Sequence, residues 1–211
     1  MSQVLPHSLL SDFDISLFLH GKHSRLYEKL GAFEIILEGV KGTFFAVWAP
    51  NAQSVHVLGN FNVWDKESHT LFPRWDSSGI WEGFIPHVHT GETYKFGIKT
   101  KTGEYLEKLD PFGLYCETPP KTASIVWNTY KEWKDQAWMK DRPTYNSLQS
   151  PMSIYEVHLG SWQRDPGDPE RFLTYVELAD KLIPYVVSVG FNDCGVASLT
   201  KLSFTILSLS F

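Results

Sequence analysis

The spacing of apolar and polar residues divides the chain into two regions with different patterns. From about residue 31 to 126, short runs rich in β-branched and aromatic residues alternate with turns that contain Gly, Asn or Pro. The runs GTFFAVWAP, SVHVLGNF, GIWEGFIP and ETYKFGIKT are typical of β-strands. Because no long helical segment separates these runs, their spacing predicts an antiparallel β-sandwich resembling the immunoglobulin fold.

Alternation within the last of these runs predicts which side chains face the core. Side chains on a strand point to opposite faces in turn, so Tyr94, Phe96 and Ile98 share one face. This apolar set is expected to lie in the core of the sandwich. Lys95 then points away from the core, toward solvent or a ligand.

The second region begins near residue 153 and has a different period. SIYEVHLG is a short apolar strand, and SWQRDPGDPE is a loop that contains two prolines. Residues 171–190 then carry apolar side chains at helical spacing, which predicts an amphipathic helix whose last turn is kinked by Pro184. A strand, a loop and an amphipathic helix form the opening of a βα unit in a parallel-stranded fold.

Three further stretches flank these regions. Residues 1–30 form a lead segment, in which Ser11 is expected to cap a short helix that runs to about Leu19. Residues 128–152 are polar with scattered Trp, which predicts a connector containing a short helix. The last twenty residues, 192–211, are rich in Ser and Leu, and their apolar spacing fits neither a helix nor a strand.

Composition and charge exclude several classes of protein. The 211 residues are 43% hydrophobic and 20% charged, which is the profile of a globular domain and not of a disordered chain. The net charge of -5 argues against a nucleic-acid partner, and no apolar run approaches the roughly 20 residues needed to span a bilayer. We see no signal peptide, and two distant cysteines, Cys116 and Cys194, do not form a disulfide framework, so we expect a cytoplasmic protein.

Polar clusters that resemble reactive sites have simpler explanations. His87 and His89 could share a face and ligate a metal, but the sequence suggests no third ligand, so we interpret them as surface histidines. Asp165, Asp168 and Glu170 could form an acid–base pair, but they directly precede a helix, where acidic residues favour the helix dipole. The chain contains no phosphate-binding loop, nucleophile elbow or CxxC motif.

Tryptophans are the most informative candidates. Trp64, in GNFNVWD, and Trp75 lie at predicted turns, where exposed indoles could stack on the apolar faces of sugar rings. Lys95 could then donate hydrogen bonds to sugar hydroxyls. Trp64 could equally be buried in the core of the sandwich, whereas Trp48 and Trp81 are interpreted as mainly structural.

Two stretches of the chain resemble a known family. GTFFAVWAPNAQSVHVLGNFNVWD and ETYKFGIKTKTGEYLEKLDPFG resemble the carbohydrate-binding module that precedes the catalytic domain of α-glucan-active enzymes. SIYEVHLGSW and YVELADKLIPYVVSVGF resemble the first barrel strand and first barrel helix of the 1,4-α-glucan (glycogen) branching enzymes of the α-amylase superfamily. Isoamylases and trehalohydrolases share the module but carry a different sequence at YEVHLGSW, so the resemblance points to branching enzymes, over about residues 27–191.

The resemblance implies an activity whose catalytic residues lie outside the stretches that match. Branching enzymes transfer an α-1,4-glucan chain to a 6-hydroxyl through a covalent glycosyl-enzyme, using an aspartate nucleophile and a glutamate acid/base. The resemblance therefore implies that no metal and no organic cofactor is needed. The aspartate and the glutamate lie on later barrel strands, so no residue of this chain inherits a catalytic role. A complete barrel takes about 250 residues, more than this whole chain.

The resemblance assigns binding residues only in the module. Trp64 falls where glucan-binding relatives place a stacking Trp, Lys95 where they place a hydroxyl-donating Lys, and Tyr105 near a second aromatic position. Glycogen or a starch-like α-glucan is the implied partner.

The expected organisation has five parts: a lead segment (1–30), a β-sandwich glucan-binding-type module (31–127), a connector (128–152), the start of a truncated catalytic barrel (153–191) and an unrelated tail, expected to arise from a frameshift (192–211). We therefore expect an N-terminal fragment of a glycogen branching enzyme without activity of its own. The alternative is a stand-alone α-glucan-binding or interaction module.

Overall fold

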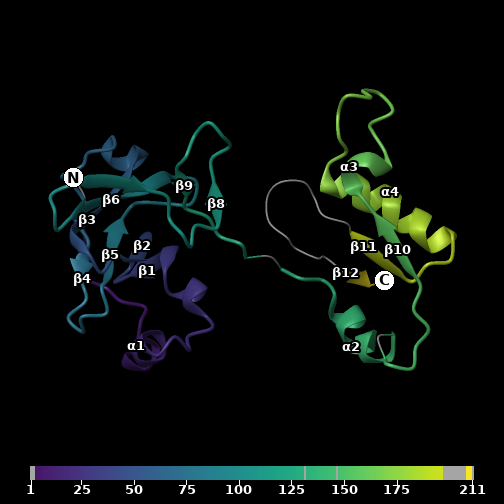
Figure 1. The fold of residues 1–211 in the computed structure, drawn as a ribbon, viewed down its shortest axis with the longest axis horizontal. Helices are drawn as coiled ribbons and strands as arrows, with labels where there is room; N and C mark the ends of the chain where they lie inside the picture. The colour runs from purple at the N-terminus through teal and green to yellow at the C-terminus, as the bar shows by residue number, and fades with distance from the viewer. Residues whose placement is uncertain (1–2, 131, 146, 197–207, 211) are drawn as a thin grey trace. The chain divides into compact units, whose positions relative to one another are not determined.

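The computed structural model divides the chain into two compact units, Met1–Glu132 and Trp133–Phe211 (Figure 1). The structure describes residues 3–130, 132–145, 147–196 and 208–210. The division between the units falls inside the stretch 128–152 that we expected to be a connector. The finer domain boundaries given above stay predictions.

The first unit is the expected sandwich of two antiparallel sheets. One sheet has the order β1-β2-β5-β4, and the other has the order β3-β6-β9-β8, with β7 pairing on β6. The strands are β1 (Gly31–Leu37), β2 (Val40–Trp48), β3 (Ala52–Gly59), β4 (Phe72–Pro73), β5 (Ile80–Pro86), β6 (Thr93–Thr100), β7 (Tyr105–Lys108), β8 (Tyr115–Cys116) and β9 (Ser124–Ile125).

The inward faces of both sheets form the main core of the first unit. Phe45 and Ile85 come from the first sheet, and Val57 and Phe96 from the second, and all four are fully buried. The predicted phase of β6 is confirmed, because Tyr94 and Phe96 are fully buried, whereas Lys95 on the opposite face is partly exposed.

Two tryptophans that we interpreted as structural take different positions. Trp81 is buried in the main core and donates from Nε1 to the carbonyl oxygen of Ala49 at 3.1 Å. Trp48 is half exposed, but its Nε1 donates to the carbonyl oxygen of Ser78 at 3.0 Å and its ring packs edge-on against Phe18.

The lead segment packs on the outer face of the first sheet and forms a second core. It contains α1 (Asp12–Leu19) and a 3-10 turn, η1 (Leu26–Glu28). The predicted cap is present: the Ser11 and Asp14 side chains form a reciprocal capping box. The second core consists of Leu10, Ile15, Leu30, Phe44, Ala46, Ile80 and Phe84. Strands β2 and β5 are therefore covered on both faces, which explains their continuous apolar runs.

The second unit contains the expected strand, loop and helix. Its elements are α2 (Gln136–Tyr145), β10 (Ile154–Val157), α3 (Leu159–Trp162), α4 (Tyr175–Ser188), β11 (Asp193–Val196) and β12 (Ser208–Ser210). Helix α4 continues through Pro184 and buries the stripe of Leu178, Leu182 and Val186. Within this stripe, Leu182 and Val186 pack on the β10–β11 pair through Val157 and Cys194.

The structure adds one parallel strand that sequence periodicity did not predict. Asp193–Val196, in the stretch 192–211, pairs in parallel with β10 in the register Ile154 with Asp193 to Val157 with Val196. Ser208–Ser210 then pairs antiparallel with β11. Residues 197–207 and 211 of this tail lie outside the described residues, and its origin stays a prediction.

Candidate functional site

Trp64 lies on a tightly folded loop that follows β3. The 3-10 turn η2 (Asn60–Asn62) leads into Val63 and Trp64, which both have left-handed backbone φ angles, 56° and 59°. A left-handed conformation is costly for a β-branched residue such as Val63, so the surrounding contacts must hold it in place. The Trp64 amide donates to the carbonyl oxygen of Gly59 at 2.9 Å, which folds the loop back on the strand.

A buried asparagine supplies those contacts. Asn62 Oδ1 accepts the Gly59 amide at 2.9 Å, and its Nδ2 donates to the carbonyl oxygen of Val57 at 2.9 Å and to Ser68 Oγ at 2.9 Å. The Trp64 indole is in turn held by its Nε1, which donates to Asn60 Oδ1 at 3.0 Å. Trp64 is partly exposed and belongs to none of the core clusters of the described residues. Its ring is therefore held in position before any ligand arrives.

Lys95, on β6, lies beside the end of β3 from which the Trp64 loop starts. It pairs across the sheet with Leu58, one residue from the pairing of Gly59 with Tyr94. Among the residues that the structure describes, Lys95 has no hydrogen-bond or ion-pair partner. A partly exposed ammonium group on a sheet face is thus available to donate to a ligand.

Tyr105 lies on the same outer face, farther along the sheet. It pairs with Lys99 on β6, and directly opposite residues share a face, so Tyr105, Lys99 and Lys95 face the same way. Lys95 and Lys99 are four positions apart, which is roughly 14 Å along an antiparallel strand. A ligand that contacts both ends of this face must therefore be extended, like an oligosaccharide of several rings.

The hydroxyl of Tyr105 points into the sheet. Its oxygen is buried with no hydrogen-bond partner in the described part of the chain, and a Cβ at Gly97 would collide with it. Burial, together with the nearby carboxylates of Glu107, Glu67 and Asp65, raises the pKa of Tyr105 to about 12. Tyr105 can thus offer a ligand its ring but not its hydroxyl.

Two charged residues tie the Trp64 loop to β7. Lys66 Nζ lies 2.9 Å from Glu107 Oε1 and 4.9 Å from the centroid of the Tyr105 ring. Sequence reasoning missed Asn62, Lys66 and Glu107, because nothing in their local spacing shows that the loop folds across the sheet. The structure thus places Lys95 and Tyr105 on one face of the sheet, and the loop that carries Trp64 reaches this face through Lys66.

The remaining polar candidates have local partners. His89 Nδ1 lies 3.1 Å from Glu34 Oε1, and among the described residues no group of three or more His, Cys, Asp or Glu is arranged to hold a metal ion. Asp165 pairs with Arg171, and Asp168 Oδ1 accepts the Glu170 amide at 3.1 Å. The side chains of Asp165 and Asp168 therefore stabilise the loop that precedes α4.

Sequence comparisons agree with the geometry of the first unit. Residues 29–113 match the model of carbohydrate-binding module 48, the isoamylase N-terminal domain, and this range contains Trp64, Lys95 and Tyr105. The chain is 52% identical to the 1,4-alpha-glucan branching enzyme GlgB of Gloeobacter violaceus, covering 88% of this chain and 25% of that protein. It is 50% identical to GlgB of Aquifex aeolicus, covering 88% and 29% respectively. The chain thus spans less than a third of the length of these curated relatives.

The solved structures that match this chain include two pullulanases. The pullulanase of Paenibacillus barengoltzii superposes with a TM-score of 0.55 at 16% identity, covering 93% of this chain and 32% of that one. The pullulanase of Bacillus acidopullulyticus gives 0.53 at 18% identity, covering 81% and 22%. At these identities the likeness establishes the fold alone. None of the helices in the described residues combines the length and apolarity needed to cross a bilayer.

Proposed function

Because the chain belongs, by its sequence, with the N-terminal part of the 1,4-alpha-glucan branching enzymes, we propose that its first unit binds α-1,4-linked glucan. The ligand lies along the outer face of β3, β6 and β7. Trp64 and Tyr105 present aromatic surfaces to the apolar faces of glucose rings, and Lys95 donates to hydroxyls between them. A cytoplasmic α-glucan such as glycogen is the partner, consistent with two free cysteines, one of them exposed.

The observation that supports this proposal is the shared face of Lys95 on β6 and Tyr105 on β7. The loop that carries Trp64 reaches the same face through the ion pair of Lys66 with Glu107. The loop hydrogen bonds fix the Trp64 ring in advance, so little conformational entropy is lost when a sugar stacks on it.

The chemistry of branching belongs to other residues of the family. A retaining transfer needs two carboxylates that flank the scissile bond, and the matched range contains no counterpart of the family's catalytic motifs. In this proposal the chain contributes glucan binding to glycogen synthesis and does not branch glucan by itself. Formation of α-1,6 linkages by the purified chain, measured by iodine staining or linkage analysis, would refute this.

Native electrophoresis in gels that contain glycogen tests the binding site. We expect the wild-type chain to be retarded, and Trp64→Ala and Lys95→Ala each to lose most of that retardation. Matched controls are Trp133→Ala, at an exposed indole of the second unit, and Lys22→Ala, at an exposed lysine of the lead segment. Equal retardation of all four variants would contradict the site, and no retardation of the wild type would favour a fragment without a binding function.

The alternative is that the chain acts as a stand-alone glucan-binding or interaction module. The compact first unit, with its own two cores, favours this alternative over a fragment that cannot fold.

A further inference from the structure

A groove on the opposite face of the sandwich has the features of a second sugar site. It lies where the lead segment and β4 both reach β5: Phe72 and Pro73 pair with Glu82 and Trp81, while Leu5 pairs with Phe84. The groove is open, has a volume of about 500 Å³ and is lined by Pro6, His7, Ser8, Leu10, Asp12, Phe72, Pro73, Arg74, Trp75 and Glu82. Because Glu82 alternates with Trp81, it faces outward, away from the main core.

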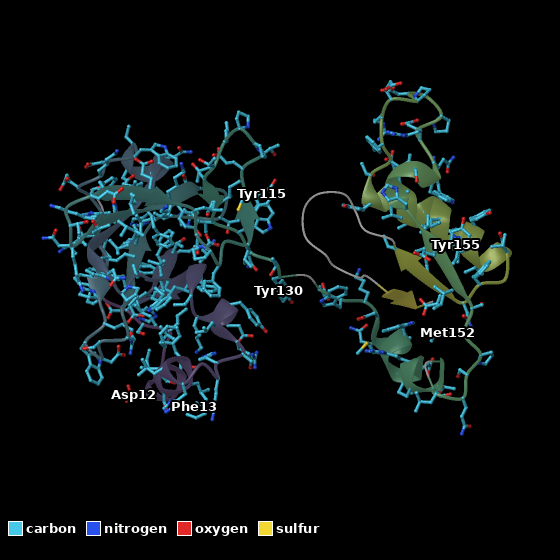
Figure 2. The ribbon with its side chains drawn as sticks, viewed as in Figure 1. Asp12, Phe13, Tyr115, Tyr130, Met152 and Tyr155 are labelled. Carbon is cyan, nitrogen blue, oxygen red and sulfur yellow. The ribbon has the colours of Figure 1, made fainter. Side chains whose placement is uncertain are left out.

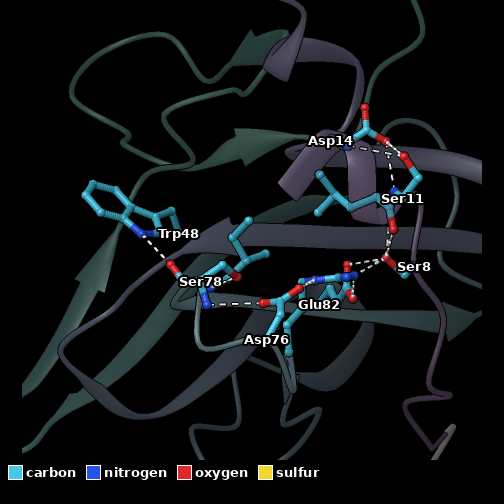
Figure 3. Close-up of polar contacts among 10 residues, drawn as sticks. Ser8, Ser11, Asp14, Trp48, Asp76, Ser78 and Glu82 are labelled. Atoms are coloured by element: carbon cyan, nitrogen blue, oxygen red, sulfur yellow. Dashed lines mark hydrogen bonds and ion pairs between the residues drawn. The ribbon is translucent and has the colours of Figure 1, made fainter. Parts of the chain in front are cut away.

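The floor of the groove is a network of polar groups in which the side chains of Arg74 and Glu82 are buried (Figure 3). Arg74 Nη1 donates to Glu82 Oε1 at 2.7 Å and to Ser8 Oγ at 2.5 Å, and Ser8 Oγ donates to Glu82 Oε2 at 2.9 Å. Arg74 Nε donates to Asp76 Oδ2 at 2.8 Å. The side chains of Arg74 and Glu82 are only 6% and 9% exposed, so the floor is rigid and its charges are paired.

The walls of the groove differ from its floor, because their polar groups are unpaired. Trp75 is 83% exposed, although it lies in the short loop between β4 and β5. Neither His7 nor Asp12 has a side-chain hydrogen-bond partner among the described residues, and Asp12 projects from α1 (Figure 2). An indole surface, an imidazole and a carboxylate thus surround a fixed polar floor.

This combination selects the class of ligand. Carboxylates at Asp12, Asp76 and Glu82 outnumber the single guanidinium of Arg74, so a phosphate or a carboxylate would be repelled. A neutral molecule with an apolar face and many hydroxyls would stack on Trp75 and hydrogen-bond to His7 and Asp12. The open shape of the groove suits a segment of a long polymer, because such a segment must enter and leave along its length.

We propose that this groove is a second binding site for α-1,4-glucan, with Trp75 as its stacking surface and His7 and Asp12 as its hydroxyl partners. The site is separate from the Trp64, Lys95 and Tyr105 face, since the two lie on the outer faces of different sheets. A sandwich with both sites holds two glucan chains, or two segments of one, on opposite faces.

Fluorine NMR of the full chain, labelled with 5-fluorotryptophan at its eight Trp, tests the second site. The probe is maltoheptaose, a linear α-1,4-linked oligosaccharide, and Trp75→Phe and Trp133→Phe assign the two resonances by their loss. In the Trp64→Ala background we expect maltoheptaose to shift the Trp75 resonance and to leave the Trp133 resonance in place. In glycogen-containing gels, adding Trp75→Ala to Trp64→Ala should weaken the remaining retention about tenfold.

Each result separates the second site from the first. If maltoheptaose shifts the Trp64 resonance of the wild type but not Trp75, the second site is refuted and the proposed function stands. If Trp75 shifts and Trp64 does not, the second site stands and the first is refuted. Because these two results come from the wild-type chain, they do not depend on whether Trp64→Ala folds correctly. If cellohexaose shifts the Trp75 resonance as much as maltoheptaose does, the assignment of the ligand to α-glucan is overturned.

Discussion

Replacing Tyr94 with Phe should destabilise the first unit by an amount that depends on pH. Tyr94 is fully buried, and its hydroxyl donates to Asp110 Oδ2 at 2.5 Å. Asp110 is itself buried, and its other carboxylate oxygen accepts the Phe112 amide at 2.8 Å. The substitution keeps the ring that packs edge-on against Phe45 and Phe96, so it removes one hydrogen bond and little else.

The magnitude follows from the charge of the acceptor. Hydrogen bonds to charged groups contribute about 1.5–3 kcal/mol, against about 1 kcal/mol for neutral pairs. We therefore expect Tyr94→Phe to cost about 2 kcal/mol near neutral pH. With a urea m-value of about 2 kcal/mol/M, the unfolding midpoint should fall by about 1 M.

The sign of the pH dependence follows from Asp110. Burial raises the pKa of Asp110, although the hydrogen bonds from Tyr94 and the Phe112 amide oppose that shift. The folded wild type therefore binds the Asp110 proton more tightly than the unfolded chain, so its stability falls as pH rises from the unfolded pKa through the folded one. Without the Tyr94 hydroxyl the folded pKa rises further, so the cost of the substitution must grow from acidic to neutral pH.

Urea unfolding followed by tryptophan fluorescence, between about pH 4 and about pH 7, measures this cost. Tyr130→Phe, at a residue that is 83% exposed, is the control and should change nothing. In an Asp110→Asn background the cost of Tyr94→Phe should become independent of pH. A cost below about 0.5 kcal/mol, or the same cost at both ends of the pH range, would refute the reasoning.

Two other predictions concern the second unit. Thr174 caps α4 in a reciprocal box with Glu177, so Thr174→Ala should cost the helix about 1 kcal/mol, seen as faster amide exchange in its first turn, whereas Ser188→Ala at the other end should leave those amides unchanged. Limited proteolysis should cut between residues 127 and 151, where the described residues contain few buried side chains, and release a stable first unit. A chain that resists protease across this stretch would contradict the second prediction.

Local chemistry was enough to predict most of the helices and strands that are seven residues or longer. Alternation of apolar residues placed β2, β3, β5 and β6 close to their observed bounds, and the Ser11 cap placed α1, because these signals depend on neighbours a few residues away. Helical spacing likewise predicted α4 and its buried stripe. The short strands β4, β8 and β9, of two residues each, carry too little pattern to be recognised.

The candidate binding site was predictable only as separate residues. A resemblance of motifs named Trp64, Lys95 and Tyr105, and strand phase directed Lys95 outward. The buried Asn62 and the Lys66–Glu107 pair, which hold the loop against β7, join residues of different elements, and sequence spacing does not encode such a contact.

The sequence by itself determined that this protein contains a β-sandwich followed by the start of a βα unit, because both follow from the period of apolar side chains. Only the tertiary structure decided that the lead segment covers the first sheet, and that it meets β4 over the Arg74–Glu82 pair to form a groove beside Trp75. Arg74 and Ser8 are 66 residues apart in the chain, yet they share a hydrogen bond. Such pairing depends on how whole elements pack, which no local run of residues specifies.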